Sequence, residues 1–343
     1  MLKPTCETSA LMDRPSFREA LISWFSANGK DYPWRRTTVP YEVLISEVML
    51  QQTQIATVLG KGYYQRFLAA FPNVLELAAA EDAELLKAWE GLGYYRRVRM
   101  LRDTARAVAA DHAGIFPHEM PDLLKLPGIG RYTAGALRAF AFGLPAVLVD
   151  GNVARVLARL MDFSNPIDEP TGIKQIWSWA ENLACDEHPR VYHAALMELG
   201  QTLCRPGVPD CLSCPVAKFC QTKSPEILPV KARKTTVTAV HEHALWMRDP
   251  QGRVLLHHEA GKRRTGLWRL PLVTPDICVN LPILLESQYA ITRYRVTLRV
   301  HDGSGFAEFQ PTSSDLWVEQ EKIAELAVAA PFRRVIERLL EDS

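Results

Sequence analysis

The chain has 343 residues, of which 48% are hydrophobic and 23% charged, and its formal net charge is +1. This composition excludes wholesale disorder, and the length suits about two domains of ~150 residues each. No uncharged apolar run approaches the ~18 residues that a membrane span needs, and the N-terminus lacks the pattern of a signal peptide. We therefore expect a soluble cytoplasmic protein without a membrane partner. Any polyanionic partner must be bound by local basic patches.

Residues 17–204 are typical of helices almost throughout. Apolar residues recur at three- and four-residue spacing in five segments, namely 41–59, 75–86, 97–112, 131–142 and 191–204. Proline and glycine signals separate the segments, and no strand-like alternation occurs between them. This part of the chain is therefore predicted to be an all-α domain.

Four of the seven cysteines lie close together, whereas Cys6, Cys185 and Cys278 stand alone. The odd total argues against a framework of disulfides. The clustered spacing is C-x6-C-x2-C-x5-C, and thiolates at such spacing bind zinc or an iron–sulfur cluster. One C-x2-C pair flanked by single cysteines favours the iron–sulfur cluster, with zinc as the alternative. The predicted ligands are Cys204, Cys211, Cys214 and Cys220.

The composition and the hydrophobic pattern of the sequence change after the cysteines. Residues 223–236 are rich in proline and basic side chains, which is typical of an exposed linker. Strands are predicted at 237–247, 253–258, 294–300, 305–309 and 315–318, and a helix at 331–340. The predicted domains are thus residues 15–222, all-α and including the cysteine loop 204–220, and residues 237–343, a small α+β domain.

A glycine-containing hairpin, Leu126-Pro127-Gly128-Ile129-Gly130, joins two of the helical segments. Glycines let successive backbone N–H groups point outward at the start of the next helix, where the helix dipole also favours an anion. An ordinary turn is the alternative. Asp150, about twenty residues after the hairpin, is expected near a bound DNA backbone and sugar.

Together these motifs resemble the helix-hairpin-helix DNA glycosylase superfamily with an iron–sulfur loop. Residues 46–54 (SEVMLQQTQ), 91–95 (GLGYY) and 148–152 (LVDGN) resemble the MutY-type adenine DNA glycosylases in particular. The resemblance covers residues 15–235 closely and extends to the C-terminus. It implies a monomeric base-excision-repair enzyme of bacterial, nucleoid-associated type that carries a [4Fe–4S] cluster. Its partner is double-stranded DNA with A:8-oxoguanine or A:G mismatches, from which it removes adenine and leaves an abasic site.

The resemblance assigns catalysis to Glu47, Asp150, Tyr132 and Asn152. Glu47 lies among apolar residues, where desolvation raises the pKa of a carboxyl group. The family uses this glutamate to protonate adenine and activate water, although a glutamate at the solvent edge of a helix is the structural alternative. Asp150 faces the sugar, or caps the helix that begins near Asn152. Tyr132 stands where bifunctional relatives carry a nucleophilic lysine, so the activity is expected to be monofunctional.

Further positions are implied in binding DNA. The resemblance places Gln51, Gln52 and Tyr94 at the wedge that fills the vacated stack, Trp34 and Arg35 near the adenine pocket, and Leu126, Gly128 and Gly130 on the phosphates. Ordinary packing is the alternative for these side chains. The basic run Arg96, Arg97, Arg99 and Arg102 either contacts phosphates or forms a solvated face.

The C-terminal domain resembles a Nudix hydrolase through residues 266–271 (GLWRLP), which match a strand of that fold. No glutamate-rich catalytic box follows, so pyrophosphate hydrolysis is not expected. Ile291-Thr292-Arg293 aligns with the loop that reads 8-oxoguanine, where Thr292 keeps only a hydroxyl. Two alternatives to adenine excision stay open: a glycosylase of the same fold acting on T or U opposite G, and a mismatch-binding module without catalysis.

Overall fold

The computed structural model describes residues 13–232, 236–261, 264–291, 293–306 and 309–342. Described residues within Met1–Glu47 and Ala110–Lys234 form one compact unit, and those within Val48–Ala109 and Thr235–Ser343 form a second. The change of unit after Lys234 falls inside the predicted linker. The sequence did not indicate that residues 48–109 group with the C-terminal part, and the domain boundaries themselves stay a prediction.

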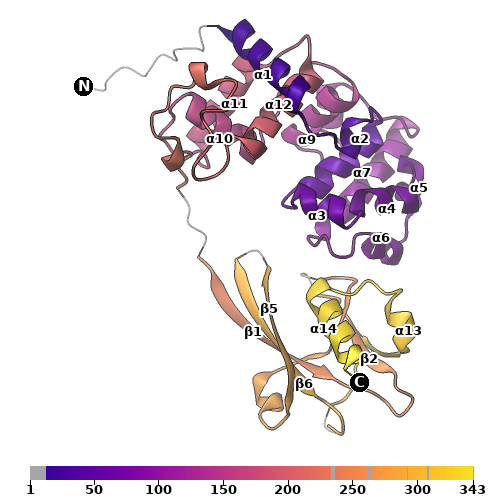
Figure 1. Ribbon diagram of the computed structural model, residues 1–343. Helices are drawn as coiled ribbons and strands as arrows, with labels where there is room; N and C mark the ends of the chain where they lie inside the picture. The colour runs from indigo at the N-terminus through magenta and orange to yellow at the C-terminus, as the bar shows by residue number, and fades with distance from the viewer. Residues whose placement is uncertain (1–12, 233–235, 262–263, 292, 307–308, 343) are drawn as a thin grey trace. The chain divides into compact units, whose positions relative to one another are not determined.

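The described residues of the first unit form helices and loops without strands (Figure 1). Its helices are α1 (Arg14–Asn28), η1 (Pro33–Arg35), most of α2 (Pro40–Leu50), α8 (Met120–Leu123), α9 (Arg131–Ala136), η2 (Leu137–Ala141), α10 (Gly151–Leu160), α11 (Pro170–Leu183), α12 (Pro189–Thr202), η3 (Ala217–Phe219) and η4 (Pro225–Ile227). Proline begins α11 and α12, where its missing N–H costs no hydrogen bond. The prediction of an all-α region is confirmed.

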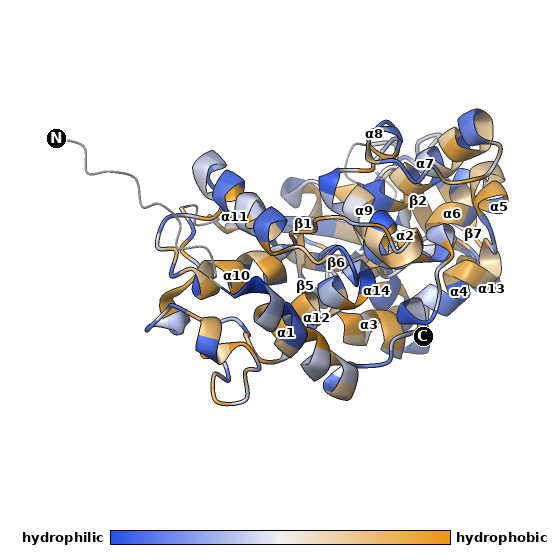
Figure 2. Cartoon of the chain, turned by 90° about the horizontal axis from the view of Figure 1, so that it is seen from above, coloured by the Kyte–Doolittle hydropathy of each residue, from blue (hydrophilic) through white to orange (hydrophobic). Residues whose placement is uncertain are grey.

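The core of this unit forms between α1, α10, α11 and α12 and includes Phe17, Val153, Ile176 and Leu196. Orange and blue stretches alternate along the helices in Figure 2, as expected where each helix buries one face. Helices α10 and α12 approach closely at Gly200, where a Cβ atom would lie 2.8 Å from that of Asn152. This contact fixes the start of α10.

The second unit begins with the end of α2 and continues through α3 (Ile55–Gly60), α4 (Tyr63–Ala70), α5 (Val74–Ala79), α6 (Asp82–Ala88) and most of α7 (Arg96–His112). The apolar pattern over 41–59 runs across two helices, because α2 ends at Leu50 and Gln52 adopts a left-handed φ of +60°. The pattern over 75–86 also divides into two helices. Extended backbone at Ala80 and Glu81 separates α5 from α6.

Two sheets build the C-terminal part. One has the order β4-β1-β6-β5 and the other β3-β2-β7, and within the first sheet β1 and β6 are parallel. The strands are β1 (Thr238–Trp246), β2 (Val254–His258), β3 (Trp268–Arg269), β4 (Leu272–Val273), β5 (Ile283–Ile291), β6 (Tyr294–Asp302) and β7 (Asp315–Val318), accompanied by η5 (Pro275–Cys278), α13 (Gln320–Ile323) and α14 (Ala330–Glu341). A sheet-containing α+β domain is thereby confirmed.

Among the described residues, the predicted strand 305–309 does not form, and two observed strands, β4 and β5, were not predicted. Residues 307–308 lie outside the described part, and Gly305, Phe306 and Phe309 belong to no strand. Phe306 donates its N–H to Gly303 O at 3.1 Å, as in a turn, because Gly303 and Gly305 interrupt the extended run. Strand β3 lies within residues 266–271, where the Nudix resemblance predicts a strand, whereas β4 and β5 carried no clear alternation in the sequence.

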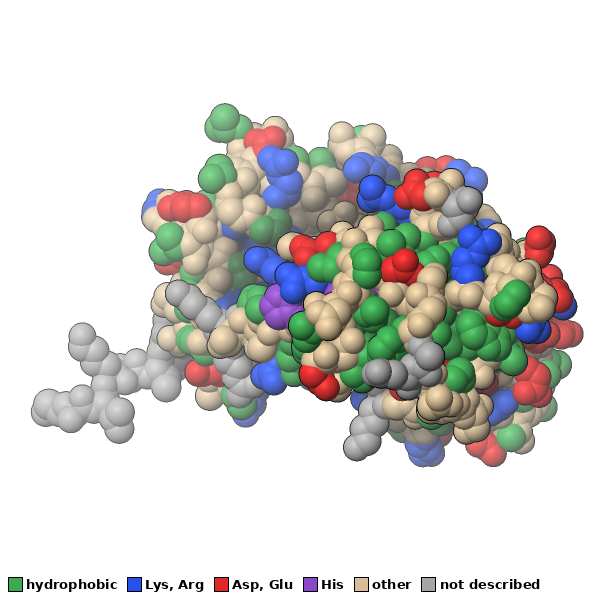
Figure 3. Space-filling model, turned by 90° about the horizontal axis from the view of Figure 1, so that it is seen from below, with side chains coloured by type: hydrophobic (Ala, Val, Ile, Leu, Met, Phe, Trp, Pro, Cys, Tyr) green, Lys and Arg blue, Asp and Glu red, His purple; other side chains and the backbone are tan. Residues whose placement is uncertain are grey.

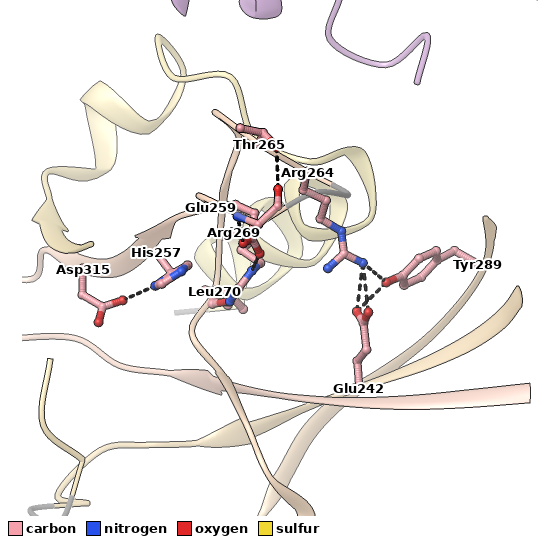
Figure 4. Close-up of polar contacts among 10 residues, drawn as sticks. Glu242, His257, Glu259, Arg264, Thr265, Arg269, Leu270, Tyr289 and Asp315 are labelled. Carbon is pink, nitrogen blue, oxygen red and sulfur yellow. Dashed lines mark hydrogen bonds and ion pairs between the residues drawn. The ribbon is translucent and has the colours of Figure 1, made fainter. Parts of the chain in front are cut away.

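Buried polar contacts attach the segment after β2 to the sheets (Figure 4). Arg264 contacts Glu242 at 3.0 Å, and the Tyr289 hydroxyl donates to the same carboxylate at 2.5 Å. Arg269 pairs with Glu259 at 2.9 Å. These pairs hold the GLWRLP segment in place.

Across the described residues, no helix is both long enough and apolar enough to span a bilayer.

Candidate active site

Glu47 lies on α2 with only 7% of its surface exposed. Its neighbours Val43, Leu44 and Val48 are buried as well. Burial, opposed by a hydrogen bond from Tyr132 and aided by the nearby Asp150, raises the pKa of Glu47 to about 7. The carboxyl group is therefore poised to exchange a proton near neutral pH. Glu47 is not at the solvent edge of its helix.

Tyr132 follows the hairpin on α9, and its hydroxyl donates a hydrogen bond to Glu47 Oε2 at 2.7 Å. Burial and the neighbouring carboxylates of Glu47 and Asp150 hold the pKa of Tyr132 well above its usual value. The side chain therefore stays a neutral hydrogen-bond donor. It offers no amine that could attack a sugar.

Asp150 precedes α10 and caps it. Its Oδ1 accepts from Val153 N at 2.7 Å, and its Oδ2 accepts from Asn152 Nδ2 at 2.9 Å. The same carboxylate raises the pKa of Glu47, so the two acidic groups are close enough to interact. The cap thus orients a negative charge toward the Glu47 site, and capping and a role facing the substrate are compatible.

Arg155 links this acidic pair to the cysteine loop, a role that sequence analysis missed. Its Nη2 donates to Asn152 Oδ1 at 2.8 Å, and its Nε donates to Cys204 O at 2.8 Å. Arg155 and Arg159 lie one turn apart and are both buried. Two arginines at i and i+4 within an otherwise apolar helix were the available signal, since arginine is rarely buried without partners.

The four clustered cysteines lie in one loop that packs on the helical core through Val216 and Phe219. Arg159 holds the loop by donating to Arg205 O at 2.8 Å and to Gly207 O at 2.9 Å. Burial, and to a smaller extent the other three thiols, raise the pKa of Cys214 to about 11. The four thiols therefore lie near enough to one another for their charges to interact.

The donor set of this loop is four sulfurs, the soft ligands that both metal alternatives use. All four cysteines come from one segment that packs on the helical core. The preference for an iron–sulfur cluster over zinc continues to rest on the sequence spacing, in which one C-x2-C pair is flanked by single cysteines.

In the hairpin, Gly128 has a φ of +77° and Gly130 caps α9. Both glycines are exposed, so their backbone is accessible, whereas the side chain of Leu126 is buried. Arg131 follows the hairpin and stacks on Trp177 with its guanidinium 3.7 Å from the ring centroid. The exposed glycine backbone next to a cation suits an anionic ligand.

Trp34 and Arg35 lie in η1 of the same unit. Trp34 is 8% exposed and stacks on Tyr32 with a centroid distance of 5.3 Å. Arg35 pairs with the buried carboxylate of Glu198 at 2.6 Å. The guanidinium is therefore already engaged by a residue that the sequence did not single out. A role of Trp34 and Arg35 toward adenine stays a prediction.

Gln51, Gln52 and Tyr94 belong to the second unit and are exposed. Gln52 and Tyr94 both adopt left-handed backbone, with φ of +60° and +49°. Arg97 joins their two loops by donating to Val48 O at 2.8 Å and to Gly93 O at 3.3 Å, and it also contacts Gln51 O. Arg97 therefore holds the loop of Gln51 and Gln52 next to the loop of Tyr94.

The other arginines of the basic run at 96–102 differ in whether they form ion pairs. Arg99 and Arg102 pair with Asp82 at 2.7 and 3.0 Å, while Arg96 is exposed. Most of the run thus stabilises the fold through ion pairs, and Arg96 is its exposed member.

Thr292, the residue aligned with the 8-oxoguanine-reading loop, lies outside the described residues. Ile291 and Tyr294 on either side pair at the tip of the β5–β6 hairpin.

Residues 45–181, which include Glu47, Tyr132 and Asp150, match the profile of the HhH-GPD superfamily base excision DNA repair proteins. Among solved structures, a thermostable thymine-DNA glycosylase is similar with a TM-score of 0.55 and 29% identity, over 61% of this chain and 95% of that chain. A non-covalent endonuclease III–DNA complex is similar with a TM-score of 0.51 and 25% identity, over the same shares.

Curated relatives are more specific. The adenine DNA glycosylase of Homo sapiens is 41% identical over 217 residues, which cover 61% of this chain and 39% of the human protein. This chain thus matches less than half the length of the human protein. The adenine DNA glycosylase of Buchnera aphidicola subsp. Baizongia pistaciae is 32% identical over 270 residues, which cover 78% of this chain and 76% of that protein. With the Glu47 site inside the matched region, the chain belongs to the adenine DNA glycosylase family.

Proposed function

We propose that this chain is a monofunctional DNA glycosylase that removes adenine mispaired with 8-oxoguanine or G in double-stranded DNA. The observation that carries the proposal is the pairing of a buried Glu47, with a pKa of about 7, and a neutral Tyr132 beside Asp150. Departure of a purine requires an acid on the base and negative charge near the developing oxocarbenium ion. The site offers both.

In this mechanism the target adenine is extruded from the stack into the site. Protonated Glu47 donates its proton to the adenine ring, which makes the base a better leaving group. The resulting carboxylate then accepts a proton from the attacking water. Tyr132 orients Glu47 Oε2 throughout and keeps its own proton.

Asp150 stabilises the positive charge that develops on the sugar. Its two oxygens are held by Val153 N and Asn152 Nδ2, so the charge is oriented before substrate binds. Asn152 thus acts as a positioning residue. The product is an abasic site in an intact strand, because no lysine is available to form a Schiff base.

The loop of Cys204, Cys211, Cys214 and Cys220 would hold a [4Fe–4S] cluster, which would order the loop. Four thiols from one loop that packs on the helical core are a donor set that such a group accepts. Arg155 connects the loop to Asn152, so an ordered loop also supports the acidic pair.

The remaining assignments rest on the sequence motifs. The C-terminal sheets form a Nudix-like domain that reads 8-oxoguanine, and the sequence alignment assigns Thr292 to this reading. Gln51, Gln52 and Tyr94 fill the stack, and the exposed backbone of Gly128 and Gly130 binds phosphates. The protein acts as a monomer in a bacterial-type cytoplasm, on the nucleoid.

A duplex panel tests the proposal. Single-turnover base release is measured with A:8-oxoguanine, A:G, T:G and U:G duplexes, and strands are analysed with and without alkali. The proposal predicts adenine release from the first two duplexes and strand scission only after alkali. Release of T or U without adenine would replace it with the alternative of the same fold, and binding without any release would leave a mismatch-binding module.

A further inference from the structure

Three metal-binding side chains converge in the C-terminal part of the chain, outside the proposed active site. They are His243 on β1, Cys278 at the end of η5 and His301 on β6. One donor atom from each lies within 4.8 Å of the other two. Neither the acidic pair nor the cysteine loop uses these residues.

The strand register places the two histidines on one face of the sheet. Strands β1 and β6 pair in parallel, with His301 opposite Leu245, which lies two residues after His243. Because side chains alternate along a strand, positions 243 and 245 share a face, and His301 shares it with them. Cys278 reaches this face from η5, which follows β4 on the other side of β1.

Burial differs among the three groups in a way that suits a bound ion with access from solvent. Cys278 and His301 are 4% and 3% exposed, whereas His243 is only half-buried. Figure 3 shows histidine side chains reaching the surface beside Lys and Arg side chains. Arg299, whose charge acts on His243, is paired with Glu286 at 2.8 Å, which reduces its repulsion of a metal ion.

The hydrogen bonds fix the tautomer of His301. Its Nδ1 lies 3.2 Å from Leu281 O, and a carbonyl oxygen can only accept, so Nδ1 carries the proton. The Nε2 lone pair then points toward His243 Nδ1 at 3.0 Å. A histidine that donates one ring N–H to a backbone carbonyl and directs the other nitrogen inward has the usual arrangement of a metal ligand.

We infer that His243 Nδ1, Cys278 Sγ and His301 Nε2 bind one zinc ion, with a water molecule as fourth ligand. Two imidazole nitrogens and one thiolate are a ligand set that zinc accepts. Tetrahedral zinc with Zn–N bonds of about 2.0 Å would place the two nitrogens about 3.3 Å apart, a few tenths beyond their present separation. On binding, the Cys278 thiol releases its proton to solvent, and His243 gives up the proton on Nδ1 that it donates to His301 and takes one on its own Nε2 from solvent.

The ion would join η5 to β1 and β6. This inference does not depend on the proposed glycosylase activity, and it concerns a different ligand set from the iron–sulfur loop. The two metal sites differ in a measurable way, since the loop offers four sulfurs and the site described here offers one.

Metal analysis of the purified full-length protein tests the inference. After dialysis against a weak chelator and reconstitution with ZnCl2, zinc and iron are counted per chain, and the zinc X-ray absorption edge gives the ligands. The expected result is one zinc with one sulfur at about 2.3 Å and three nitrogen or oxygen atoms at about 2.0–2.1 Å. A zinc shell of four sulfurs, or no retained zinc, would overturn the inference.

Matched variants assign the residues. Cys278→Ala and His243→Gln are expected to weaken zinc binding at least tenfold and to abolish the rise in Tm on adding ZnCl2. Cys185→Ala is the control, because Cys185 is also 4% exposed and lies in the other unit. His243→Gln alters a half-buried position and keeps the test valid if Cys278→Ala does not fold. If His243→Gln binds zinc as tightly as the wild type and shows the same rise in Tm with ZnCl2, the proposed site is contradicted.

Discussion

The Tyr132 hydroxyl donates to Glu47 Oε2 at 2.7 Å, joining the first turn of α9 to the carboxyl group on α2. The bond stabilises the ionised form of Glu47 and so offsets part of the desolvation that raises its pKa. Tyr132 therefore tunes the proton affinity of Glu47 while being too weak an acid to lose its own proton.

Tyr132→Phe is predicted to move the basic limb of the pH–rate profile to higher pH. A hydrogen bond to a charged group is worth ~1.5–3 kcal/mol, which corresponds to about one to two pH units. The measurement is single-turnover adenine release from pH 5 to 9.5. Tyr192→Phe is the control, since this buried hydroxyl has no hydrogen-bond partner among the residues that the structure describes. An unmoved limb in Tyr132→Phe would mean that the bond does not tune Glu47.

Glu47→Gln is predicted to stabilise the fold more at pH 8 than at pH 5. Between pH 4.5 and about 7 the unfolded chain ionises while native Glu47 keeps its proton, so wild-type stability falls as pH rises. This pKa shift corresponds to roughly 3 kcal/mol of folding stability, which the wild type has below pH 4.5 and has lost completely above about pH 7. Glutamine does not titrate and escapes this loss. Urea unfolding of both proteins at several pH values measures the difference, and a pH-independent difference would contradict the raised pKa.

The local features of the site were predictable from sequence, because they depend on neighbours along the chain. The apolar residues around Glu47 indicated burial, and Asp150 before a helical segment indicated a cap. The break after Leu50 was not predictable from periodicity, since apolar spacing continues through α3. The partners of Arg155 and the meeting of His243 with His301 depend on contacts between distant segments, which periodicity does not encode.

Arg159→Lys is predicted to release the cysteine loop. The guanidinium is 1% exposed and donates to Leu228 O, Arg205 O and Gly207 O, three carbonyls that one ammonium cannot reach together. Each buried acceptor without a partner costs ~1–3 kcal/mol. The iron and sulfide content per chain should fall, and the free energy of unfolding measured in urea should fall as well. Arg205→Lys, an exposed change in the same loop, is the control, and equal iron retention in both variants would contradict the role of Arg159.

Arg97→Lys is predicted to weaken both mismatch binding and excision. The side chain joins the Gln51 and Tyr94 loops through carbonyl contacts on both, and lysine cannot bridge the two sides. The loss is expected to be ~1–3 kcal/mol, about tenfold or more in affinity for an A:8-oxoguanine duplex. Arg96→Lys keeps the charge at the adjacent exposed position and serves as control. Wild-type affinity and excision rate in Arg97→Lys would show that the two loops act independently.

The most direct test is single-turnover adenine release from an A:8-oxoguanine duplex by the wild type and by Glu47→Gln, across pH and beside a binding titration. The wild-type rate should fall as pH rises above about 7, where Glu47 loses its proton. The variant should bind the duplex normally and excise about 10²–10⁴-fold more slowly or worse. Glu42→Gln, earlier on the same helix, should retain the wild-type rate. A wild-type rate that does not change around pH 7, or near-normal excision by Glu47→Gln, would contradict the assignment of Glu47 as the acid.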